Sequence, residues 1–505
     1  MIAPVLPPPL LDRLGECVRA SFTSGQVAEA LGLPGQAAMD RGDLAGAERL
    51  TRGGSPTETL IRLFLLGLPV PAGAGTTALA PVPVDRAVQA GLLTVGSDGQ
   101  LLAALDLRPY SEQGGPDWWL LSDLGSDVRP GQLHPEHVLG VGRAATTLAQ
   151  ATVRRPAGRA LDIGTGSGVQ ALHLSRHCES IVATDVSERA LSFAAANAAL
   201  NGQRWELRQG SLLAPVAGEQ FDLIVCNPPF IVGPGFTSGS GGFTYRDSGM
   251  SSDSVSRRLI EGLPALLGSG GTAQLLANWV IGADGDWQDR VGGWLPAHGV
   301  DAWIWQREVA EPAEYVALWL RDGGEQPGTD GWSRRYHRWL DWFADAGVAA
   351  VGMGLVNLRR TDEPSRIYCE DVPQAYQPPI GPAIEGWFER TGWLAGADLL
   401  SARLQAAPGL VLTTRSLLGE SGWDPALRLL TQSGGMRWEL EVDQAVEMLV
   451  AACTGEVSIR LVLELLAGAV GLAVDDVART LTPVLTDLVR RGLLLPVELA
   501  NGGVA

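Results

Sequence analysis

The chain has 505 residues, 46% of them hydrophobic, which is enough for a large core and suggests about three domains. Its net charge is −18, and all 38 basic residues are arginines. This acidity argues against a broad nucleic-acid-binding surface, because contacts to phosphates supply most sequence-independent affinity, but it leaves room for a local arginine patch. The five cysteines are widely separated and form no CxxC pair, which predicts free thiols in a reducing compartment and no zinc site.

Two features of the chain bear on its location. No apolar run approaches the roughly 18 residues of a membrane span. A secretory signal has a basic stretch followed by a hydrophobic core, and the N-terminal residues lack this pattern. We therefore expect a soluble, cytoplasmic protein with no membrane partner.

Residues 1–128 have the pattern of a separate, largely helical module. Apolar residues at helical spacing predict three helices, over 10–22, 25–31 and 56–66. A helix over 84–90 and a hairpin that turns at Asp98-Gly99 follow, and together they resemble a winged helix. The module holds 8 Arg against 14 Asp and Glu, so an interaction module or a substrate platform is favoured over a DNA-binding role.

His134 and His137 have the H-x-x-H spacing of a metal-binding pair. Pro135 lies between them and no cluster of Cys or carboxylate residues follows, so a structural linker is the favoured interpretation. Residues 140–153 then have the spacing of a helix that should lead into the first strand of the central domain. We expect no metal ion.

Three apolar runs in the middle of the chain end in polar or glycine-rich sequence. The first, 160–163, stops at a loop with three glycines and is followed by a helical pattern. The second, 180–184, ends in Asp185, and the third, 221–226, ends in the sequence Asn227-Pro228-Pro229-Phe230. Open α/β sheets bind ligands at the carboxyl ends of their strands, so these groups are predicted to converge on one site.

The glycine loop indicates a nucleotide-like ligand. Gly164, Gly166 and Gly168 let the backbone pass close to a ligand, but Val169 stands where a dinucleotide fingerprint needs a small residue. Asp185 follows Gly166 by 19 residues, a distance that suits an acidic group on the ribose hydroxyls. The alternatives are a glycine-rich turn without a ligand, and an aspartate that caps the next helix.

The Asn-Pro-Pro-Phe sequence suits the chemistry of a planar nitrogen. The lone pair of an amide or aryl amine is delocalised, and the Asn227 side-chain oxygen and the Pro228 carbonyl can accept both N–H bonds and localise it. Two prolines stiffen the loop, and Phe230 offers a face for stacking. A structural turn without a catalytic role is the alternative.

These motifs resemble motifs I, II and IV of the class I S-adenosylmethionine-dependent methyltransferases, in the branch with Asn-Pro-Pro-Phe or Asn-Pro-Pro-Tyr that methylates protein glutamine or the amino groups of adenine and guanine. The resemblance covers residues 133–371. It implies S-adenosylmethionine as the cofactor and Asn227, Pro228, Pro229 and Phe230 as the catalytic residues. It also implies a set of cofactor-binding residues, namely Asp162, Gly164, Thr165, Gly166, Gly168, Asp185, Val186, Ser211, Leu212 and Asn227. Many relatives have a longer polar side chain where this chain has Ser211.

Beyond the catalytic motif, residues 233–242 are glycine-rich and are predicted to be a mobile lid, with a passive linker as the alternative. Arg246 closes this segment as a candidate anchor for a substrate carboxylate or phosphate. Further strands are predicted over 272–281, 300–307 and 348–358. The sequence from Arg334 to Trp339 is densely basic and aromatic, and an exposed arginine face with buried tryptophans is slightly favoured over nucleic-acid contact.

A proline-rich stretch over 373–382 marks a domain boundary. Apolar spacing beyond it predicts three amphipathic helices and a final strand, over 443–453, 458–469, 474–491 and 493–497. This segment is again winged-helix-like and acidic, with 9 Arg against 15 Asp and Glu from residue 376 onward. We expect neither flanking module to bind DNA on its own.

The sequence therefore predicts an α/β protein with a Rossmann-like, seven-stranded methyltransferase sheet between two mainly helical, winged-helix-like domains. The predicted boundaries are 1–128, 129–375 and 376–505. The predicted reaction is methylation of a planar nitrogen, with a nucleobase amino group of RNA or DNA placed first because Phe230 is typical of those enzymes. The alternatives are a protein glutamine, which the acidic charge favours, and a non-catalytic sensor or scaffold, which the intact catalytic motif disfavours.

Overall fold

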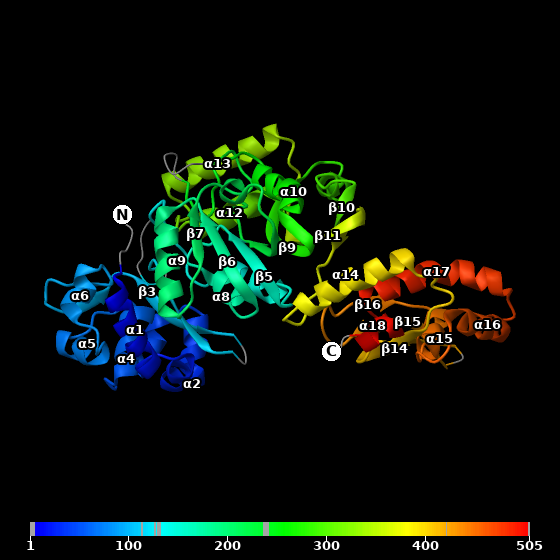
Figure 1. The fold of residues 1–505 in the computed structure, drawn as a ribbon, viewed down its shortest axis with the longest axis horizontal. Helices are drawn as coiled ribbons and strands as arrows, with labels where there is room; N and C mark the ends of the chain where they lie inside the picture. The colour runs from blue at the N-terminus through cyan, green and yellow to red at the C-terminus, as the bar shows by residue number, and fades with distance from the viewer. Residues whose placement is uncertain are drawn as a thin grey trace. The chain divides into compact units, whose positions relative to one another are not determined.

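The computed structural model describes residues 6–112, 115–125, 128, 133–235, 242–420 and 422–502. Contacts group the chain into two units, the first formed by Met1–Ala149 with Arg155–Asp371 and the second by Gln150–Arg154 with Val372–Ala505 (Figure 1). The N-terminal helices and the central sheet thus share one compact unit. The division into three domains remains a prediction.

The first unit is built on a sheet that has eight strands among the described residues, in the order β12-β10-β11-β9-β8-β5-β6-β7. The strands are β5 Ala157–Ile163, β6 Cys178–Asp185, β7 Glu206–Gln209, β8 Phe221–Cys226, β9 Leu267–Ile281, β10 His298–Ala310, β11 Ala350–Pro364 and β12 Ile367–Asp371. Strands β7, β6, β5, β8 and β9 are parallel, and β11 is antiparallel to both β9 and β10. The Rossmann-like α/β class is confirmed.

The sheet has one strand more than predicted. The additional strand β12 pairs in parallel with β10 at the edge of the sheet. Its five residues are mostly half-buried and lack a clear alternation of apolar and polar side chains, so the sequence carries little strand signal there.

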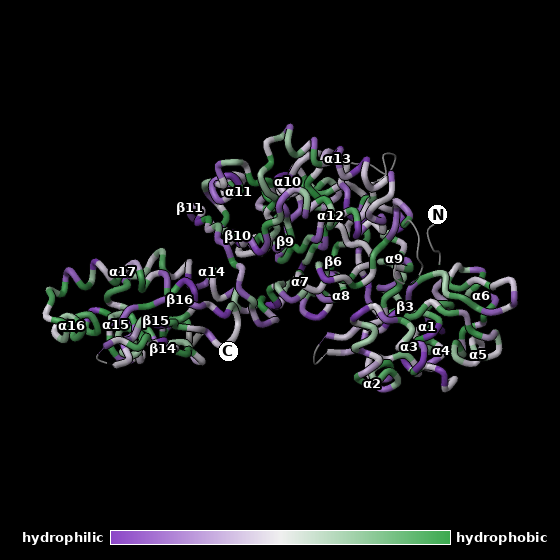
Figure 2. The backbone as a smooth tube through the Cα atoms, turned by 180° about the vertical axis from the view of Figure 1, so that it is seen from behind, coloured by the Kyte–Doolittle hydropathy of each residue, from purple (hydrophilic) through white to green (hydrophobic). Residues whose placement is uncertain are grey.

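Helices pack against this sheet, and its strands contribute buried hydrophobic residues of the kind drawn green in Figure 2. The helices are α7 Arg143–Ala151, α8 Val169–Leu174, α9 Glu188–Leu200, the 3₁₀ turn Ala214–Val216, α10 Ser254–Leu266, α11 Trp287–Gly292, α12 Pro312–Asp322 and α13 Asp330–Asp345. Trp279, Trp303 and Trp305 are completely buried. The core beneath the site is therefore large and rigid.

The N-terminal part is helical, as predicted, and its core continues into the sheet domain. Its elements are α1 Pro8–Ser21, α2 Ser24–Asp40, α3 Leu44–Leu50, α4 Pro56–Leu60, the π-helical turn Ile61–Leu65, α5 Ala72–Ala78, α6 Val84–Gln89, β1 Leu93–Val95, β2 Leu101–Ala103, β3 Asp106–Ser111 and β4 Asp117–Ser122. The predicted hairpin is β1 with β2, whereas the hairpin β3–β4 was not predicted. Phe193 and Leu200 of α9 belong to the same apolar cluster as the N-terminal helices.

The second unit contains the three predicted helices and the final strand. Its elements are α14 Gly381–Gly396, β13 Leu404–Ala406, β14 Leu410–Gly419, β15 Gly422–Gln432, β16 Glu439–Glu441, α15 Gln444–Ala452, α16 Ile459–Val470, α17 Val474–Arg491, β17 Leu494–Pro496 and α18 Val497–Gly502. Strand β17 pairs with β13, and β14, β15 and β16 form a separate antiparallel sheet that was not predicted. The winged-helix-like character of both ends remains a prediction.

Within the described residues no helix is long and apolar enough to cross a membrane.

Candidate active site

The carboxyl ends of β5, β6 and β8 meet beside a cavity of about 400 Å³. Strand β5 lies between β6 and β8 in parallel register, so the loops that follow the three strands emerge side by side. The predicted site residues that line the cavity are Gly164, Thr165, Gly166, Asp185, Val186, Ser211, Leu212, Asn227, Pro228 and Pro229. Asp162, Gly168 and Phe230 are not part of the lining.

The glycine loop needs its glycines for two different reasons. Gly166 has φ of 55°, and a Cβ there would meet no atom within 4 Å, so its backbone is open toward the cavity. Gly168 has φ of 89°, and a Cβ there would come within 2.5 Å of the Trp205 ring. Gly168 therefore packs the start of α8 against an aromatic ring, behind the cavity.

Asp185 lines the cavity with a fixed orientation. Its Oδ2 accepts the Gly166 N–H at 2.9 Å, and its Oδ1 accepts the Ser187 N–H at 2.9 Å. Burial raises the pKa of this carboxyl group, and the two backbone hydrogen bonds oppose that rise. The N-cap of α9 is Ser187, whose side chain accepts the Ala190 N–H, so Asp185 is not the cap residue.

Asp162 supports the glycine loop without lining the cavity. It is completely buried, and its Oδ2 accepts a hydrogen bond from the Thr165 hydroxyl at 2.6 Å. Burial raises the pKa of this carboxyl group to about 7, with the Thr165 hydrogen bond acting in the opposite direction. Thr165, which lines the cavity, is held by this contact.

Asn197 of α9 connects the glycine loop to the N-terminal part. The side chain is completely buried, and its amide nitrogen donates to Ser167 O at 2.8 Å and Leu121 O at 2.9 Å. Its oxygen accepts the Leu121 N–H at 2.8 Å. One turn later, Asn201 makes the equivalent pair of bonds to the backbone of Trp119. The sequence signal was a polar residue inside an alanine-rich helix, and we did not predict its role.

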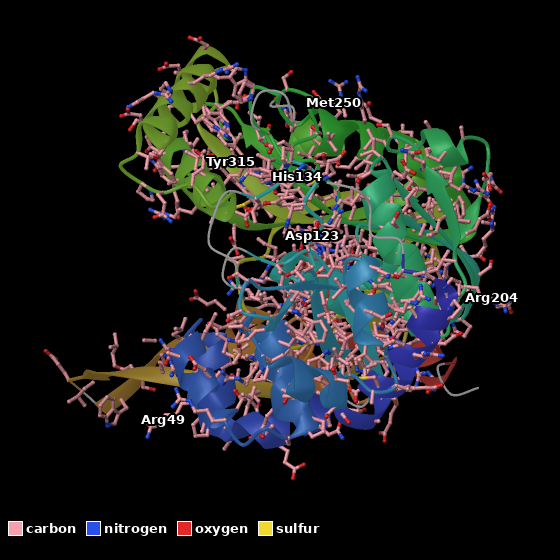
Figure 3. The ribbon with its side chains drawn as sticks, turned by 90° about the vertical axis from the view of Figure 1, so that its left-hand side faces the viewer. Arg49, Asp123, His134, Arg204, Met250 and Tyr315 are labelled. Atoms are coloured by element: carbon pink, nitrogen blue, oxygen red, sulfur yellow. The ribbon has the colours of Figure 1, made fainter. Side chains whose placement is uncertain are left out.

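The Asn-Pro-Pro-Phe loop is anchored by buried aromatic residues. Two residues after Phe230, the Val232 N–H donates to Tyr315 Oη at 2.9 Å, and Trp339 Nε1 donates to Val232 O at 3.1 Å. Asn278 Nδ2 also donates to Tyr315 Oη, at 2.9 Å. Tyr315 lies among the yellow-green helices α12 and α13 (Figure 3). No local pattern in the sequence indicated this anchor.

This anchor decides the interpretation of the basic and aromatic cluster on α13. Trp339 is completely buried and Trp332 nearly so, and Arg335 forms an ion pair with Glu325 at 3.0 Å. Trp339, the tryptophan of the cluster, is therefore unavailable for stacking on bases. The favoured prediction, inward-facing tryptophans on an arginine-rich helix, agrees with this packing.

Phe230 lies at the end of the catalytic motif and packs edge-on against Trp319, with ring centroids 6.1 Å apart. Its ring is half-buried and lies outside the cavity lining. Within the cavity, Phe230 therefore offers no open face for the predicted stacking of a planar group.

The opposite wall of the cavity comes from two segments, 136–145 and 244–250, which the Thr244 N–H to Pro135 O hydrogen bond of 2.8 Å joins. Arg246 is buried in the second segment, where it pairs with Asp247 at 3.0 Å and donates to Trp319 O. The prediction of Arg246 as a substrate anchor is wrong, because its guanidinium is already occupied by structural partners. Residues 236–241, the centre of the predicted lid, lie outside the described residues.

His137 belongs to a buried cluster that ties this wall to α9. Asp123 accepts hydrogen bonds from Arg189 Nε at 3.1 Å and from the Val138 N–H at 2.9 Å, and its Oδ2 lies 3.9 Å from His137 Nδ1. Burial lowers the pKa of His137. Asp123 lies where the N-terminal helices meet the sheet domain (Figure 3). No group of three or more potential metal ligands occurs within the described ranges.

A family model for the methyltransferase small domain matches residues 140–239. Two models of domains of unknown function match the flanks, over 19–104 and 385–496. Residues 140–239 are therefore similar to a methyltransferase domain, in agreement with the resemblance of the sequence motifs.

Curated relatives are similar to the same region. A release factor glutamine methyltransferase from Xylella fastidiosa is 39% identical over 153 residues, which are 28% of this chain and 54% of that protein. A ribosomal RNA small subunit methyltransferase C from Alcanivorax borkumensis is 31% identical over 121 residues, 24% of this chain and 32% of that protein. The chain thus spans about half the length of the release factor methyltransferases it matches, or less.

Among solved structures, a T. thermophilus 16S rRNA N2 G1207 methyltransferase in complex with AdoMet and guanosine is 16% identical. The match covers 51% of this chain and 64% of that chain, with a TM-score of 0.26.

Proposed function

We propose that the protein transfers a methyl group from S-adenosylmethionine to a planar amide or amino nitrogen. One observation carries the proposal: Asn227 and Pro228, at the end of β8, line the same cavity as the glycine loop and Asp185. The groups that suit a cofactor and those that suit a planar N–H substrate thus line one cavity, as a direct transfer requires.

The residues present suit the cofactor. The Gly166 backbone is open toward the cavity, and Asp185 keeps lone pairs for two ribose hydroxyls beyond the N–H groups it already accepts. Ser211 and Leu212 line the cavity after β7, and these residues would hold the base of the cofactor. When bound, the cofactor supplies an electrophilic methyl group on a positively charged sulfur.

The chain itself contributes polarisation and orientation. The Asn227 side-chain oxygen and the Pro228 carbonyl accept the two N–H bonds of the target, which draws its lone pair out of conjugation. Pro228 and Pro229 add no competing donors and restrict the loop. Tyr315 and Trp339 hold the backbone of Val232 at the end of the loop, and this restrains the Pro228 carbonyl before the target binds.

For the substrate, the cavity favours an uncharged amide. Its described lining contains the acidic residues Glu136, Asp185 and Asp247 and no arginine, and the whole chain carries a charge of −18. A phosphate backbone would be repelled by this lining, whereas a glutamine side chain would not. The similarity to a release factor glutamine methyltransferase agrees with this choice. We therefore place protein glutamine before the nucleobase that the sequence alone favoured.

The second candidate, a nucleobase amino group, rests on Phe230 and on the similarity to a ribosomal RNA methyltransferase. A single labelling experiment separates the two. The purified protein is incubated with methyl-labelled S-adenosylmethionine and an extract of cells that lack it, and the product is digested with protease or nuclease before precipitation. We expect label that protease releases and that is recovered as N5-methylglutamine. Label released by nuclease would establish the second candidate, and no transfer by a protein that binds the cofactor would contradict methylation.

A further inference from the structure

The C-terminal unit carries a strand with an unpaired edge. Strand β14 pairs along its whole length with β15, and β16 pairs only with the far side of β15, at Leu429, Leu430 and Thr431 (Figure 1). Among the described residues no strand lies on the other side of β14. Its outward N–H and C=O groups are therefore available to another extended chain.

The side chains of this ribbon are exposed and apolar. Leu417 and Leu418 are each 69% exposed and Trp423 is 71% exposed, with Val411 and Leu412 also exposed. Leu418 and Trp423 are directly opposite each other near the tip of the ribbon. Protruding two-stranded ribbons are marginally stable in water, so a long apolar ribbon of this kind gains stability from further strands.

Strand β14 lacks the devices that normally protect an edge. It contains no lysine or proline and one charged residue, Arg415. The register shift in the pair lies on β15, where Leu427 and Pro425 are paired and Ala426 between them is not. The outer edge of β14 is thus continuous over ten residues.

We propose that β14 pairs antiparallel with β14 of a second copy of the chain, about a two-fold axis that is perpendicular to the sheet and sets Thr414 opposite its own copy. Directly opposite residues have their side chains on the same face of a sheet, so this register sets Leu410 against Leu418 and Val411 against Leu417. The neighbouring symmetric registers are less favourable, because one sets Val411 against Arg415 and the other sets Arg415 against its own copy, and like charges directly opposite are unfavourable. The strand is therefore self-complementary in one register, which is what a two-fold interface needs.

The pairing joins two three-stranded sheets into one of six strands and removes both free edges. It involves only the C-terminal unit and does not depend on the reaction proposed for the central domain. The association is therefore tested separately from catalysis.

The test is the mass of the full-length protein in solution, measured by sedimentation over about 1–100 µM. We expect a dimer at the upper end of this range. Leu417→Lys places a charge against Val411 of the second copy twice in each dimer, and it should weaken the dimer at least about tenfold. Leu465→Lys is the matched control, because Leu465 is 65% exposed on α16 of the same unit. The control should leave the dimer intact.

Hydrogen exchange on the wild-type protein gives a second measurement that needs no variant. The outward amides of residues 410–418 should be protected in concentrated protein and should lose protection on dilution. A monomer at 100 µM, or an equal loss of the dimer in Leu417→Lys and Leu465→Lys, would overturn the proposal. Dimerisation without protection of these amides would overturn it as well.

Discussion

The loops after β5 and β8 face one cavity, but they are held in place by different kinds of contact. The glycine loop is held by polar side chains, since Asp185, Asn197 and Thr165 with Asp162 all hydrogen-bond within or onto it. The Asn-Pro-Pro-Phe loop is held at its end by buried aromatic residues, Tyr315 and Trp339. The first loop thus depends on α9 and the N-terminal part, and the second on the helices between β10 and β11. Cofactor binding and turnover should therefore respond to different substitutions.

The largest effect is expected at Asn227. Asn227→Ala removes an acceptor whose bond strengthens as the target nitrogen loses its planarity, so turnover should fall by about 10²–10³. Cofactor affinity should fall much less. Single-turnover rates, calorimetry with S-adenosylmethionine and the melting temperature are measured on the same variant. An unchanged rate would refute the catalytic role, and a joint loss of stability and cofactor affinity would indicate a structural loop.

The next largest effect is expected at Asn197, and Asn201, one helical turn later, provides the comparison. Asn197→Ala leaves the backbone groups of Leu121 and Ser167 without their buried partners, so we expect a loss of about 2–4 kcal/mol in the free energy of unfolding together with weaker cofactor binding. Asn201→Ala removes the bonds to Trp119 but leaves the glycine loop alone, so it should lower stability and spare the cofactor. Denaturant unfolding and calorimetry on both variants test this, and equal effects on affinity would show that the loop does not depend on Asn197.

A substitution of Asp185 tests directly whether the glycine loop and its neighbours bind the cofactor. Asp185→Ala removes the carboxylate that we expect to hold the ribose, and it frees the Gly166 N–H. Cofactor affinity should fall by about 1–3 kcal/mol, the range for a charge-assisted hydrogen bond. Asp185→Asn serves as the control, since an amide of the same shape should retain part of the binding. Affinity that stays unchanged in the alanine variant would remove Asp185 from the cofactor site.

Tyr315 tests the aromatic anchor. Tyr315→Phe keeps the ring but removes the hydroxyl that accepts from Val232 N and Asn278 Nδ2. We expect about 1–2 kcal/mol of lost stability. Turnover should also fall, by roughly tenfold, because the Asn227 loop is less well positioned. The cofactor dissociation constant should not change, and a marked rise in it would mean that the two loops are not supported independently.

The smallest effect concerns pH and Asp162. The pKa of its carboxyl group is about 7 in the folded protein and lies near 4 in the unfolded chain. A raised pKa gives stabilisation that is complete below pH 4 and is lost as the pH rises to about 7. Asp162→Asn does not titrate at this position and serves as the reference. Relative to it, the free energy of unfolding of the cofactor-free protein should fall by about 1–2 kcal/mol between pH 4.5 and 7.5. The full effect would be about 1.4 kcal/mol per pKa unit, and structural relaxation reduces it. Parallel curves for the two proteins would show that Asp162 stays ionised.

The sequence by itself determined the elements whose signal is local. The strands that end in the glycine loop, in Asp185 and in the Asn-Pro-Pro-Phe loop lie where apolar runs and turn residues placed them, and the three C-terminal helices follow their apolar spacing. The convergence of the three strand ends on one cavity also followed from the rule for parallel sheets.

Only the tertiary structure decided which residues support the site, because their partners are far away in the chain. Asn197 reaches Leu121 across 76 residues, and Tyr315 reaches Val232 across 83. Arg246 was assigned a ligand role because a lone arginine beside a glycine-rich segment looks available, and the fold instead buries it against Trp319 and Asp247. The unpaired edge of β14 was hidden for the same reason, since a strand's neighbours are set by the fold and not by its own residues.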